Sequence, residues 1–438
     1  MRGRTKVMAC AVIVGACLAS AAPAWASKTV CASGCSFKTI QAAVNAAAPG
    51  ATITIAGGSY FENVVVNKPL TLRGSGNSTV IYPAVAEPIC SPGSLCEGKA
   101  SNIILVEAND VTITKLQLNG DSPNITSSVV VGGADISARN GIITNHLNKG
   151  ATYTNLTVSH VQVSNIYLRG IYSSTSGGTF NFNHDTVTNV QAEEQSIAMF
   201  AFEGSGVMER NKVSAANDAI SENWSKGTRF LDNKVTNSGS GIHTDNNGGA
   251  GGVSDLISGN KVSACSSNGY GIFVFAPYVS ATVEANKISG CYIGLAAFGS
   301  QGAGEPRPTF ANNKVSGAGA STTEPGGTYG AYLTTDLVGF GFANVMATLT
   351  NNQIEGFGTG VLVTQTKPTH GDAAGGQATV SASHNTIHHN GTGANGETGT
   401  LAEAQNNYWG CPQGPNNSPN CDTAIGTVSY TPWLRSKP

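Results

Sequence analysis

Short apolar runs alternate with polar turns along most of the chain, and between residues 207 and 315 one polar phrase recurs with little change. The phrase is Asn, then Lys, then Val or Ile, and it begins at Asn211, Asn233, Asn260, Asn286 and Asn313. The successive spacings are 22, 27, 26 and 27 residues, with a β-rich run before each phrase and a Gly/Ser-rich piece and a second run after it. A period of this length, made of strands and turns without a helical pattern, predicts a solenoid whose repeat is one coil.

The repeated Asn has a conformational explanation. A tight bend between two strands of one coil needs a residue with positive φ, and Asn accepts that conformation better than other residues except Gly. Stacked coils lie about 4.8 Å apart, so the Asn amides are expected to hydrogen-bond each other along the stack. The register extends to Val161 and Asp185 upstream, and to Asn352, Asn385 and Asn407 downstream. It predicts roughly ten to twelve coils and a rod of about 50–60 Å.

Both ends of the chain carry further motifs. The opening contains Phe37-Lys38-Thr39-Ile40-Gln41-Ala42-Ala43-Val44 and the segments 52–55, 58–62 and 68–74, and the ending runs from Asn406-Asn407-Tyr408-Trp409-Gly410-Cys411 to Trp433. With these motifs the chain resembles the right-handed parallel β-helix proteins of the pectin lyase-like superfamily over nearly its whole mature length. The resemblance implies an all-β fold, a single-stranded right-handed parallel β-helix (β-solenoid). That fold carries lyases, hydrolases, esterases, epimerases and non-enzymes, so it does not choose an activity.

The N-terminus predicts export. Arg2, Arg4 and Lys6 precede an apolar run from Val7 to Ala22, and small residues before Ser27 suit cleavage, so residues 1–26 are expected to be a signal peptide. The alternative is a lipoprotein box that would lipidate Cys17. No other run is long enough to span a membrane, and the mature protein is expected to be secreted, either extracellular or periplasmic.

Composition narrows the class of partner. Residues 1–26 contain three basic residues and no acids, so their removal changes the net charge from −2 to −5. This mild negative charge argues against nucleic acid as a partner.

The length alone would suggest two or three domains, but the unbroken repeat predicts one domain over residues 27–438, with a C-terminal cap from about 406 to 438.

Eight cysteines follow the signal peptide, an even number that favours disulfides over metal ligands in an exported chain. Local pairs are expected for Cys31 with Cys35, Cys90 with Cys96, and Cys411 with Cys421. Cys265 and Cys291 each lie five residues after a repeated Asn, so they occupy the same position in adjacent coils. One coil spacing suits a disulfide, and a staple is expected there; the alternative is two buried free thiols.

A short amphipathic helix is expected near the N-terminus, capped by Ser36 and ended by Pro49-Gly50, with Phe37, Ile40 and Val44 on one face. That face would cover the open N-terminal end of the stack. The segments 302–328 and 367–377 lengthen their coils enough to build the walls of a cleft.

Candidate binding residues come from the second run of each coil. If Ile242, Thr244, Ile272 and Val274 point into the bore, the alternate residues form one column on the outer surface. The proposed substrate-binding members of that column are Tyr172, Phe200, Asn223, Phe273, Phe275, Phe298 and Tyr332. A solvent face so rich in aromatic rings suits stacking on sugars. The alternative is that the long loops cover these rings.

His243 and Asp245 lie on one strand face in this register, and Glu222 falls one coil earlier at an inward position. Glu222 is therefore expected either as a buried paired acid or on a bulge that brings it to the surface. These three residues are the candidate catalytic groups for opening a glycosidic linkage by hydrolysis or β-elimination. The alternative is ordinary polar decoration of a β-surface.

The sharper catalytic patterns of the pectin lyase-like superfamily are absent: those of polygalacturonases, pectin methylesterases, pectate lyases and alginate epimerases. The hypothesis is therefore an exported monomer that binds, and as an enzyme of the lyase or hydrolase type also cleaves, an extracellular polysaccharide, without metal or cofactor. The alternative is a non-catalytic adhesive rod at the cell surface.

Overall fold

The computed structural model describes residues 28–438, apart from residues 149, 247–251, 266–268, 276–280, 300–307, 318–326, 336–343 and 366–374. The predicted signal peptide lies outside the described residues, as does much of the two long loops expected at 302–328 and 367–377.

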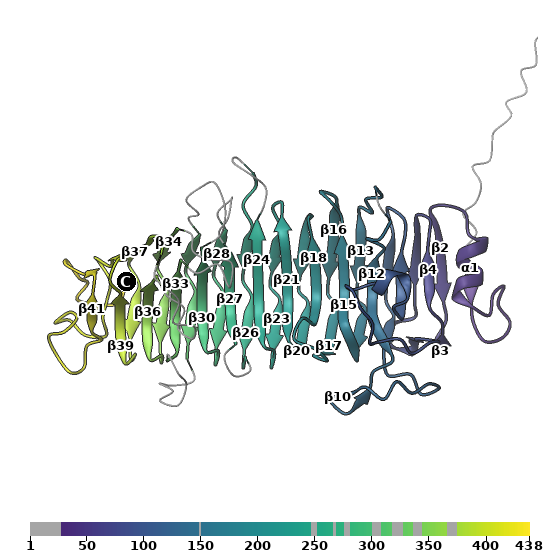
Figure 1. Ribbon diagram of the computed structural model, residues 1–438, viewed down its shortest axis with the longest axis horizontal. Helices are drawn as coiled ribbons and strands as arrows, with labels where there is room; N and C mark the ends of the chain where they lie inside the picture. The colour runs from purple at the N-terminus through teal and green to yellow at the C-terminus, as the bar shows by residue number, and fades with distance from the viewer. Residues whose placement is uncertain are drawn as a thin grey trace, which may run out of the picture.

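Three long parallel sheets wrap a single bore, and successive strands of one sheet come from successive coils (Figure 1). Sheet A has fifteen strands: β1 Lys28–Val30, β2 Ala51–Ile55, β5 Leu70–Arg73, β8 Thr112–Thr114, β13 Leu156–Ser159, β16 Thr179–Asn183, β19 Ser205–Glu209, β22 Arg229–Leu231, β25 Leu256–Ser258, β28 Thr282–Glu284, β31 Thr309–Ala311, β34 Val345–Thr350, β37 Ala378–Ser383, β40 Leu401–Glu403 and β42 Val428–Ser429. Sheet B has twelve strands: β3 Gly58–Phe61, β6 Thr79–Tyr82, β9 Gln117–Asn119, β14 Gln162–Ser164, β17 Thr186–Val190, β20 Lys212–Ala216, β23 Lys234–Thr236, β26 Lys261–Ser263, β29 Lys287–Ser289, β32 Lys314–Ser316, β35 Gln353–Glu355 and β38 Thr386–His388.

Sheet C has thirteen strands: β4 Val64–Val66, β7 Asn102–Val106, β12 Ala138–Thr144, β15 Ile166–Ser174, β18 Ile197–Phe202, β21 Asp218–Ser225, β24 Ser240–Asn246, β27 Tyr270–Phe275, β30 Ile293–Phe298, β33 Tyr329–Thr334, β36 Thr359–Thr364, β39 Thr392–Gly396 and β41 Ala424–Gly426. A small hairpin of β10 Val130–Val131 and β11 Ala134–Asp135 projects from the rod (Figure 1). The structure confirms the predicted parallel β-helix.

The repeated Asn residues form a continuous ladder between sheets A and B. Its members are Asn211, Asn233, Asn260, Asn286, Asn313, Asn352, Asn385 and Asn407, each at most 1% exposed. At every step the backbone N–H of one Asn donates to the side-chain Oδ1 of the next, over 2.8–3.0 Å. Each side-chain amide also donates to a backbone carbonyl of the preceding coil. The expected stacking of amides is therefore present.

The prediction that these Asn residues themselves have a positive φ is wrong. The left-handed residue is the one immediately before each ladder Asn: Arg210, Asp232, Gly259, Ala285, Asn312, Asn351, His384 and Asn406. The preceding residue makes the change of direction, and this leaves the Asn side chain free to turn into the bore, where its amide meets those of the neighbouring coils. A sequence pattern marks the bend but does not say which of its two residues takes the strain.

Asp185 occupies the ladder position one coil before Asn211. Its backbone N–H donates to Oδ1 of Asn211 at 2.9 Å, and its own Oδ1 accepts from the backbone N–H of Val161 at 2.9 Å. Burial raises the pKa of this carboxyl well above its usual range. The register predicted upstream of the clear repeats is thus confirmed.

Both ends of the bore are closed. Helix α1 spans Ile40–Ala46 and lies at one end of the rod (Figure 1), where Ile40, Ala43 and Val44 are fully buried. Its N-cap is Thr39, whose side chain accepts from Ala42 N, and not the predicted Ser36, because the chain before it pairs with β1 through Phe37. At the other end the indole of Trp409 is fully buried.

Four disulfides join Cys31 to Cys35, Cys90 to Cys96, Cys265 to Cys291, and Cys411 to Cys421. These are the four expected pairs. The bridge between Cys265 and Cys291 staples adjacent coils, with a Cα–Cα distance of 4.7 Å.

Replacement of Asn260 by Ala tests the ladder. The variant removes the acceptor of the Asn233 backbone and side-chain N–H groups and leaves buried donors without partners. We expect unfolding to become easier by roughly 2–4 kcal/mol. Chemical denaturation would measure this, with Asn181→Ala, at an exposed position of the same rod, as the control that changes little. Equal stability of the two variants would contradict the ladder's role.

Candidate functional site

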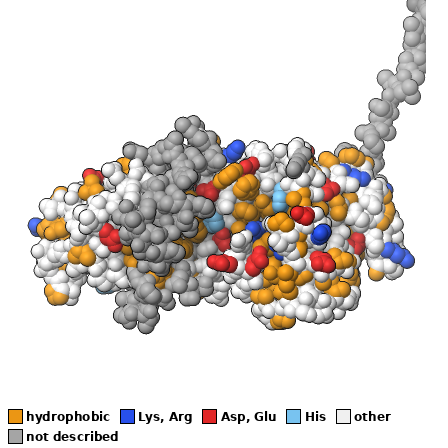
Figure 2. All heavy atoms as spheres, in the orientation of Figure 1, with side chains coloured by type: hydrophobic (Ala, Val, Ile, Leu, Met, Phe, Trp, Pro, Cys, Tyr) orange, Lys and Arg blue, Asp and Glu red, His pale blue; other side chains and the backbone are white. Residues whose placement is uncertain are grey.

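The outer face of sheet C carries two columns of side chains where the sequence predicted one. Ile242, Thr244, Ile272 and Val274 point into the bore as expected and are at most 1% exposed. One outer column runs through Tyr172, Phe200, Ser221, His243, Phe273, Ala296 and Tyr332. The other contains Phe202, Asn223, Asp245, Phe275, Phe298 and Thr334, with a bulge between Glu222 and Ser225. On the face seen in Figures 1 and 2, acidic and histidine side chains lie among hydrophobic ones, between the grey atoms and the α1 end.

Most of the predicted aromatic residues pack against each other. Tyr172 stacks on Phe200 with ring centres 4.7 Å apart, and Phe275 stacks on Phe298 at 5.3 Å. Tyr172, Phe200, Phe298 and Tyr332 are at most 6% exposed, whereas Phe273 and Phe275 are half-buried. Of the predicted aromatic residues, only Phe273 and Phe275 therefore keep part of their rings accessible on this face.

Among the residues that the structure describes, Trp224 is the most accessible aromatic side chain beside these columns. It is 47% exposed, has a φ of 58°, and lies with its ring centre 5.3 Å from that of Phe202. The bulge in β21 turns this residue outward, which a strict two-residue alternation cannot predict. Neither Trp224 nor Phe202 is therefore among the binding residues predicted from the sequence.

A chain of polar contacts joins the neighbouring strands β21 and β24. Nδ1 of His243 lies 3.1 Å from Oδ2 of Asp218, and its Nε2 lies 3.1 Å from Oδ1 of Asn223. The hydroxyl of Ser240 donates to Oδ1 of Asp218 at 2.6 Å. The ring of His243 also stacks on Phe273, with centres 4.6 Å apart. The imidazole is thus held between two oxygen acceptors and an aromatic ring, and Asp218, which sequence analysis did not select, is its main partner.

His243 and Asp218 each stabilise the charged form of the other. Burial alone would lower the pKa of His243, but the carboxylate of Asp218, with a smaller contribution from Asp245, outweighs it and the pKa of His243 is raised. Burial likewise would raise the pKa of Asp218, but His243 and the surrounding hydrogen bonds lower it. The imidazolium–carboxylate form is therefore favoured in the folded protein.

Asp245 is the carboxyl group best suited to proton transfer on this face. Its Oδ1 accepts from the backbone N–H of Trp224. Burial raises its pKa to about 6, although that hydrogen bond and the charge of His243 act in the opposite direction. A carboxyl group with a pKa near 6 exchanges its proton readily under mildly acidic conditions.

Glu222 lies on the other side of the sheet. It is fully buried in the bore, and neither of its carboxylate oxygens has a hydrogen-bond partner among the described residues. Burial, with the charge of Asp255 nearby, holds its pKa well above its usual range. Glu222 thus points inward, as one of the two expected arrangements has it, but without the hydrogen-bond partner that this arrangement assumed. The sheet therefore separates Glu222 from His243 and Asp245.

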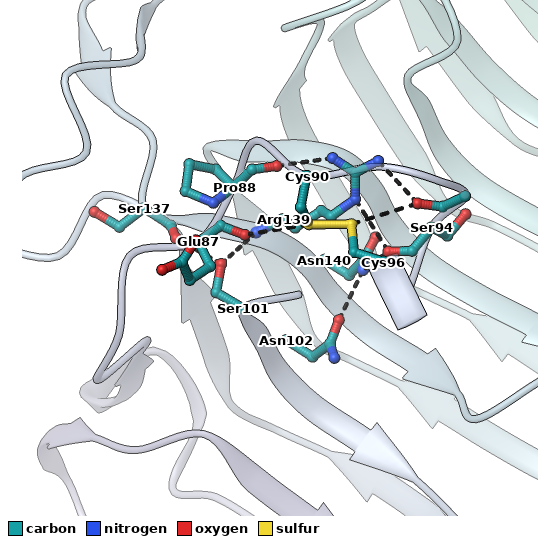
Figure 3. Close-up of a disulfide and its surroundings, with 11 residues drawn as sticks. Glu87, Pro88, Cys90, Ser94, Cys96, Ser101, Asn102, Ser137, Arg139 and Asn140 are labelled. Carbon is teal, nitrogen blue, oxygen red and sulfur yellow. Dashed lines mark hydrogen bonds between the residues drawn. A yellow bond between two sulfur atoms is a disulfide. The ribbon is translucent and has the colours of Figure 1, made fainter. Parts of the chain in front are cut away.

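A cavity of about 550 Å³ lies at the N-terminal end of this face, lined among others by Arg139, Tyr167, Arg169 and Glu193. Figure 3 shows one wall: Arg139 donates to the carbonyls of Pro88, Gly93 and Ser94 and so holds the loop closed by Cys90 and Cys96. Arg169 projects from β15, where burial lowers its pKa to about 10, and its guanidinium lies 5.0 Å from the ring of Phe200. The cavity thus continues the outer face of sheet C with hydrogen-bond donors.

The pairing of Asp218 with His243 can be tested by titration. In Asp218→Asn the main group that raises the pKa of His243 is removed. Burial still lowers this pKa and only the smaller effect of Asp245 still raises it, so we expect the pKa of His243 to fall. Because the native pKa is raised, the stability contributed by this histidine is fully present below its unfolded pKa, about 6.5, and is lost as the pH rises through the folded value. NMR titration of the ring would measure the shift, with Asp232→Asn, at an exposed carboxylate, as the control. An unchanged or higher value in Asp218→Asn would contradict the pairing.

Solved structures with this fold act on, or are bound to, carbohydrates in several cases. The chain is similar to the catalytic domain of a GH87 α-1,3-glucanase D1069A variant in complex with tetrasaccharides, with 13% identity, a TM-score of 0.58, and 94% of this chain and 70% of that one covered. It is also similar to the A-module of the Azotobacter vinelandii mannuronan C-5 epimerase AlgE6, with 15% identity, a TM-score of 0.48, and coverage of 91% and 94%. At these identities the likeness shows the fold alone. No curated protein matches the chain in a sequence comparison.

A family model described as periplasmic copper-binding protein (NosD) matches residues 181–431. The four disulfides and a periplasmic family both agree with an exported protein. Among the described residues, no helix has the length and apolar character needed to cross a membrane. Because the match spans more than half of the chain, the protein belongs to the NosD family of right-handed β-helix proteins.

Proposed function

We propose that the protein binds an extracellular polysaccharide on the outer face of sheet C and cleaves a glycosidic bond in it. The observation that carries this proposal is the exposed ring of Trp224 directly beside the half-buried Asp245, whose carboxylate accepts the Trp224 backbone N–H. An exposed ring offers an apolar face for stacking on a sugar, and the adjacent carboxyl group can exchange a proton with a sugar oxygen.

Three residues of the acid–histidine cluster, Asp245, His243 and Asn223, have different roles in this proposal. Asp245, with a pKa of about 6, donates a proton to the departing glycosidic oxygen as the bond between this oxygen and the anomeric carbon breaks. A water molecule adds to the anomeric carbon, and the proton that it releases returns through solvent to the Asp245 carboxylate. His243, held cationic by Asp218, keeps positive charge next to the site, and its contact with Asn223 orients that amide toward a sugar hydroxyl. Glu222 has no direct role, because it lies inside the bore.

The half-buried rings of Phe273 and Phe275 extend the binding face toward the C-terminus, and the cavity with Arg139 and Arg169 extends it in the other direction. A linear chain of sugars suits such a strip, because the coils repeat along it at intervals of about 4.8 Å. The sugar complexes of the GH87 structures are in line with this use of the fold, but they carry no residue across to this chain.

The family description names copper, and only some residues of this chain are suitable copper ligands. Soft thiolate and thioether ligands suit Cu(I), but the eight cysteines after residue 26 form disulfides, and Met199 and Met208 are fully buried in the core. Met346, half-buried on β34, is the one other methionine among the described residues. Histidine and carboxylate groups suit divalent copper, and the described residues bring one such group together at Glu355, His388 and His389. The two histidines of this group, with Glu355 beside them, would hold a divalent ion away from the sugar-binding face.

Replacement of Trp224 by Ala tests the binding face. We expect about tenfold weaker binding to any polysaccharide that the mature protein binds on a glycan array, because the variant removes the exposed stacking surface. Phe61→Ala is the matched control, since Phe61 is an exposed ring stacked on Tyr82 but belongs to sheet B. Equal binding by the wild type and Trp224→Ala, or no binding to any glycan, would favour the alternative of a non-catalytic adhesive rod.

Replacement of Asp245 by Asn tests the chemistry. If Asp245 is the general acid, cleavage requires its protonated form, so activity should fall as the pH rises through about 6. The Asn variant should bind the sugar within a fewfold of wild type but lose about 10²–10⁴ in rate. Analysis of the products released from the bound glycan would show both effects. Unaltered cleavage in Asp245→Asn would remove Asp245 from the mechanism.

A further inference from the structure

In one outer column of sheet B, the type of side chain changes at the C-terminal end of the rod. Through five successive coils the column consists of small hydroxyl side chains, at Ser214, Thr236, Ser263, Ser289 and Ser316. In the last two strands, β35 and β38, the same positions are Glu355 and His388, which pair directly in register. A carboxylate and an imidazole therefore lie one coil apart on the rod surface.

Glu355 lies beside Nε2 of His388 at an ion-pair distance, without the geometry of a hydrogen bond. Its Oε2 lies 3.0 Å from Nε2 of His388 and also accepts from Nε2 of Gln353 at 3.2 Å. A carboxylate in this place favours the proton on Nε2 and so leaves the lone pair of a neutral His388 on Nδ1. Nδ1 in turn lies 3.0 Å from Nδ1 of His389.

The backbone brings the second histidine to that point. His389 follows the last residue of β38 and has a φ of 59°, which turns its side chain back beside that of His388. The ring centres lie 4.5 Å apart with an interplanar angle of 68°. His388 is 5% exposed and His389 is exposed, so the two nitrogens meet at the surface with one fixed ring and one accessible ring.

The C-terminal cap holds the fixed ring in place. The backbone N–H of Ile387 donates to the carbonyl of Tyr408 at 2.8 Å, and Gly410, with a φ of 85°, passes over His388 so closely that a Cβ there would lie 3.2 Å from the His388 Cβ. The Cys411–Cys421 disulfide closes the same cap. The position of His388 is therefore set by the closed end of the rod.

We propose that His388 and His389 bind a divalent transition-metal ion of the Cu²⁺ or Zn²⁺ class through their Nδ1 atoms. Two imidazole nitrogens that face each other at 3.0 Å must share a proton unless a cation takes both lone pairs. Imidazole ligands select this class of ion over Mg²⁺ and Ca²⁺, which prefer oxygen. Glu355 is a positioning residue here: a carboxylate on the far nitrogen of a ligating histidine fixes its tautomer and increases its basicity.

This site is independent of the proposed sugar-binding face, because its residues belong to sheet B and to the cap, whereas Trp224, His243 and Asp245 belong to sheet C. Failure of one proposal therefore leaves the other unchanged.

The first test is direct binding of CuCl₂ or ZnCl₂ to the full mature protein after treatment with a chelator, measured by competition with a chromophoric chelator. We expect one equivalent to bind, and at least about tenfold weaker binding in His389→Asn. Asn tolerates the left-handed conformation of this position, so the fold should be kept. His384→Asn is the matched control, since His384 is also an exposed histidine with positive φ just before an Asn.

The outcomes are distinct. Equal affinity in wild type and His389→Asn, or an equal loss in His384→Asn, would overturn the site, since either result would mean that any surface histidine serves. Thermal melting of each apo variant separates a loss of ligand from a loss of fold. No binding of either ion by a folded wild-type protein would also overturn the proposal.

Glu355→Gln tests the positioning role. The variant keeps the shape of the side chain and an oxygen acceptor but removes the charge, so we expect about 10–100-fold weaker binding with the nitrogen ligands retained. Electron paramagnetic resonance of the Cu²⁺-loaded protein should therefore show two nitrogen ligands in Glu355→Gln but fewer in His389→Asn. Unchanged affinity in Glu355→Gln would show that Glu355 has no part in the site.

Discussion

The structure depends on the ladder of buried amides between sheets A and B. A parallel β-helix has no local hairpins to set its register, so each coil must be aligned on the previous one by contacts distant in sequence. The ladder does this because each Asn side chain accepts from a backbone N–H of the preceding coil and donates to a carbonyl of that same coil, while its own backbone N–H donates to the Asn of the next coil. An unsatisfied polar group in the bore would be costly. A slip of one residue would break the whole chain of bonds and turn every side chain to the opposite face.

This alignment brings side chains that are distant in sequence into contact on the surface. Asp218 and His243 are separated by more than twenty residues, yet they meet because β21 and β24 are neighbours in sheet C. Glu355 and His388 meet in the same way between β35 and β38. In both places a carboxylate of one coil orients an imidazole of the next, and the difference lies in what surrounds the ring. His243 stacks on Phe273 within a largely aromatic face, whereas His388 faces a second histidine at the end of the rod.

The proposed sugar-binding face depends on the continuity of the solenoid, whereas the proposed metal site depends on its end. The face of sheet C is long and continuous, with aromatic rings and polar groups at regular steps, and this suits an extended polymer. The site in sheet B exists because the repeat stops: the left-handed His389 and the cap that covers His388 occur where the coils end. A repeating rod thus offers an extended surface along its side and a local, rigid arrangement at its end.

The sequence by itself determined the architecture, since the spacing of the Asn phrase, the inward positions of Ile242 and Ile272 and the pairing of Cys265 with Cys291 all depend on the period of the repeat. It also placed His243 and Asp245 on one outer face. Only the tertiary structure decided that the residue before each ladder Asn takes the positive φ, that a bulge exposes Trp224, that Glu222 remains in the bore, and that Tyr172, Phe200, Phe298 and Tyr332 bury one another. The physical reason is that a period specifies which positions repeat. Bulges, ring packing and ionic contacts depend on distances between neighbouring coils, and these exist only after the coils have stacked.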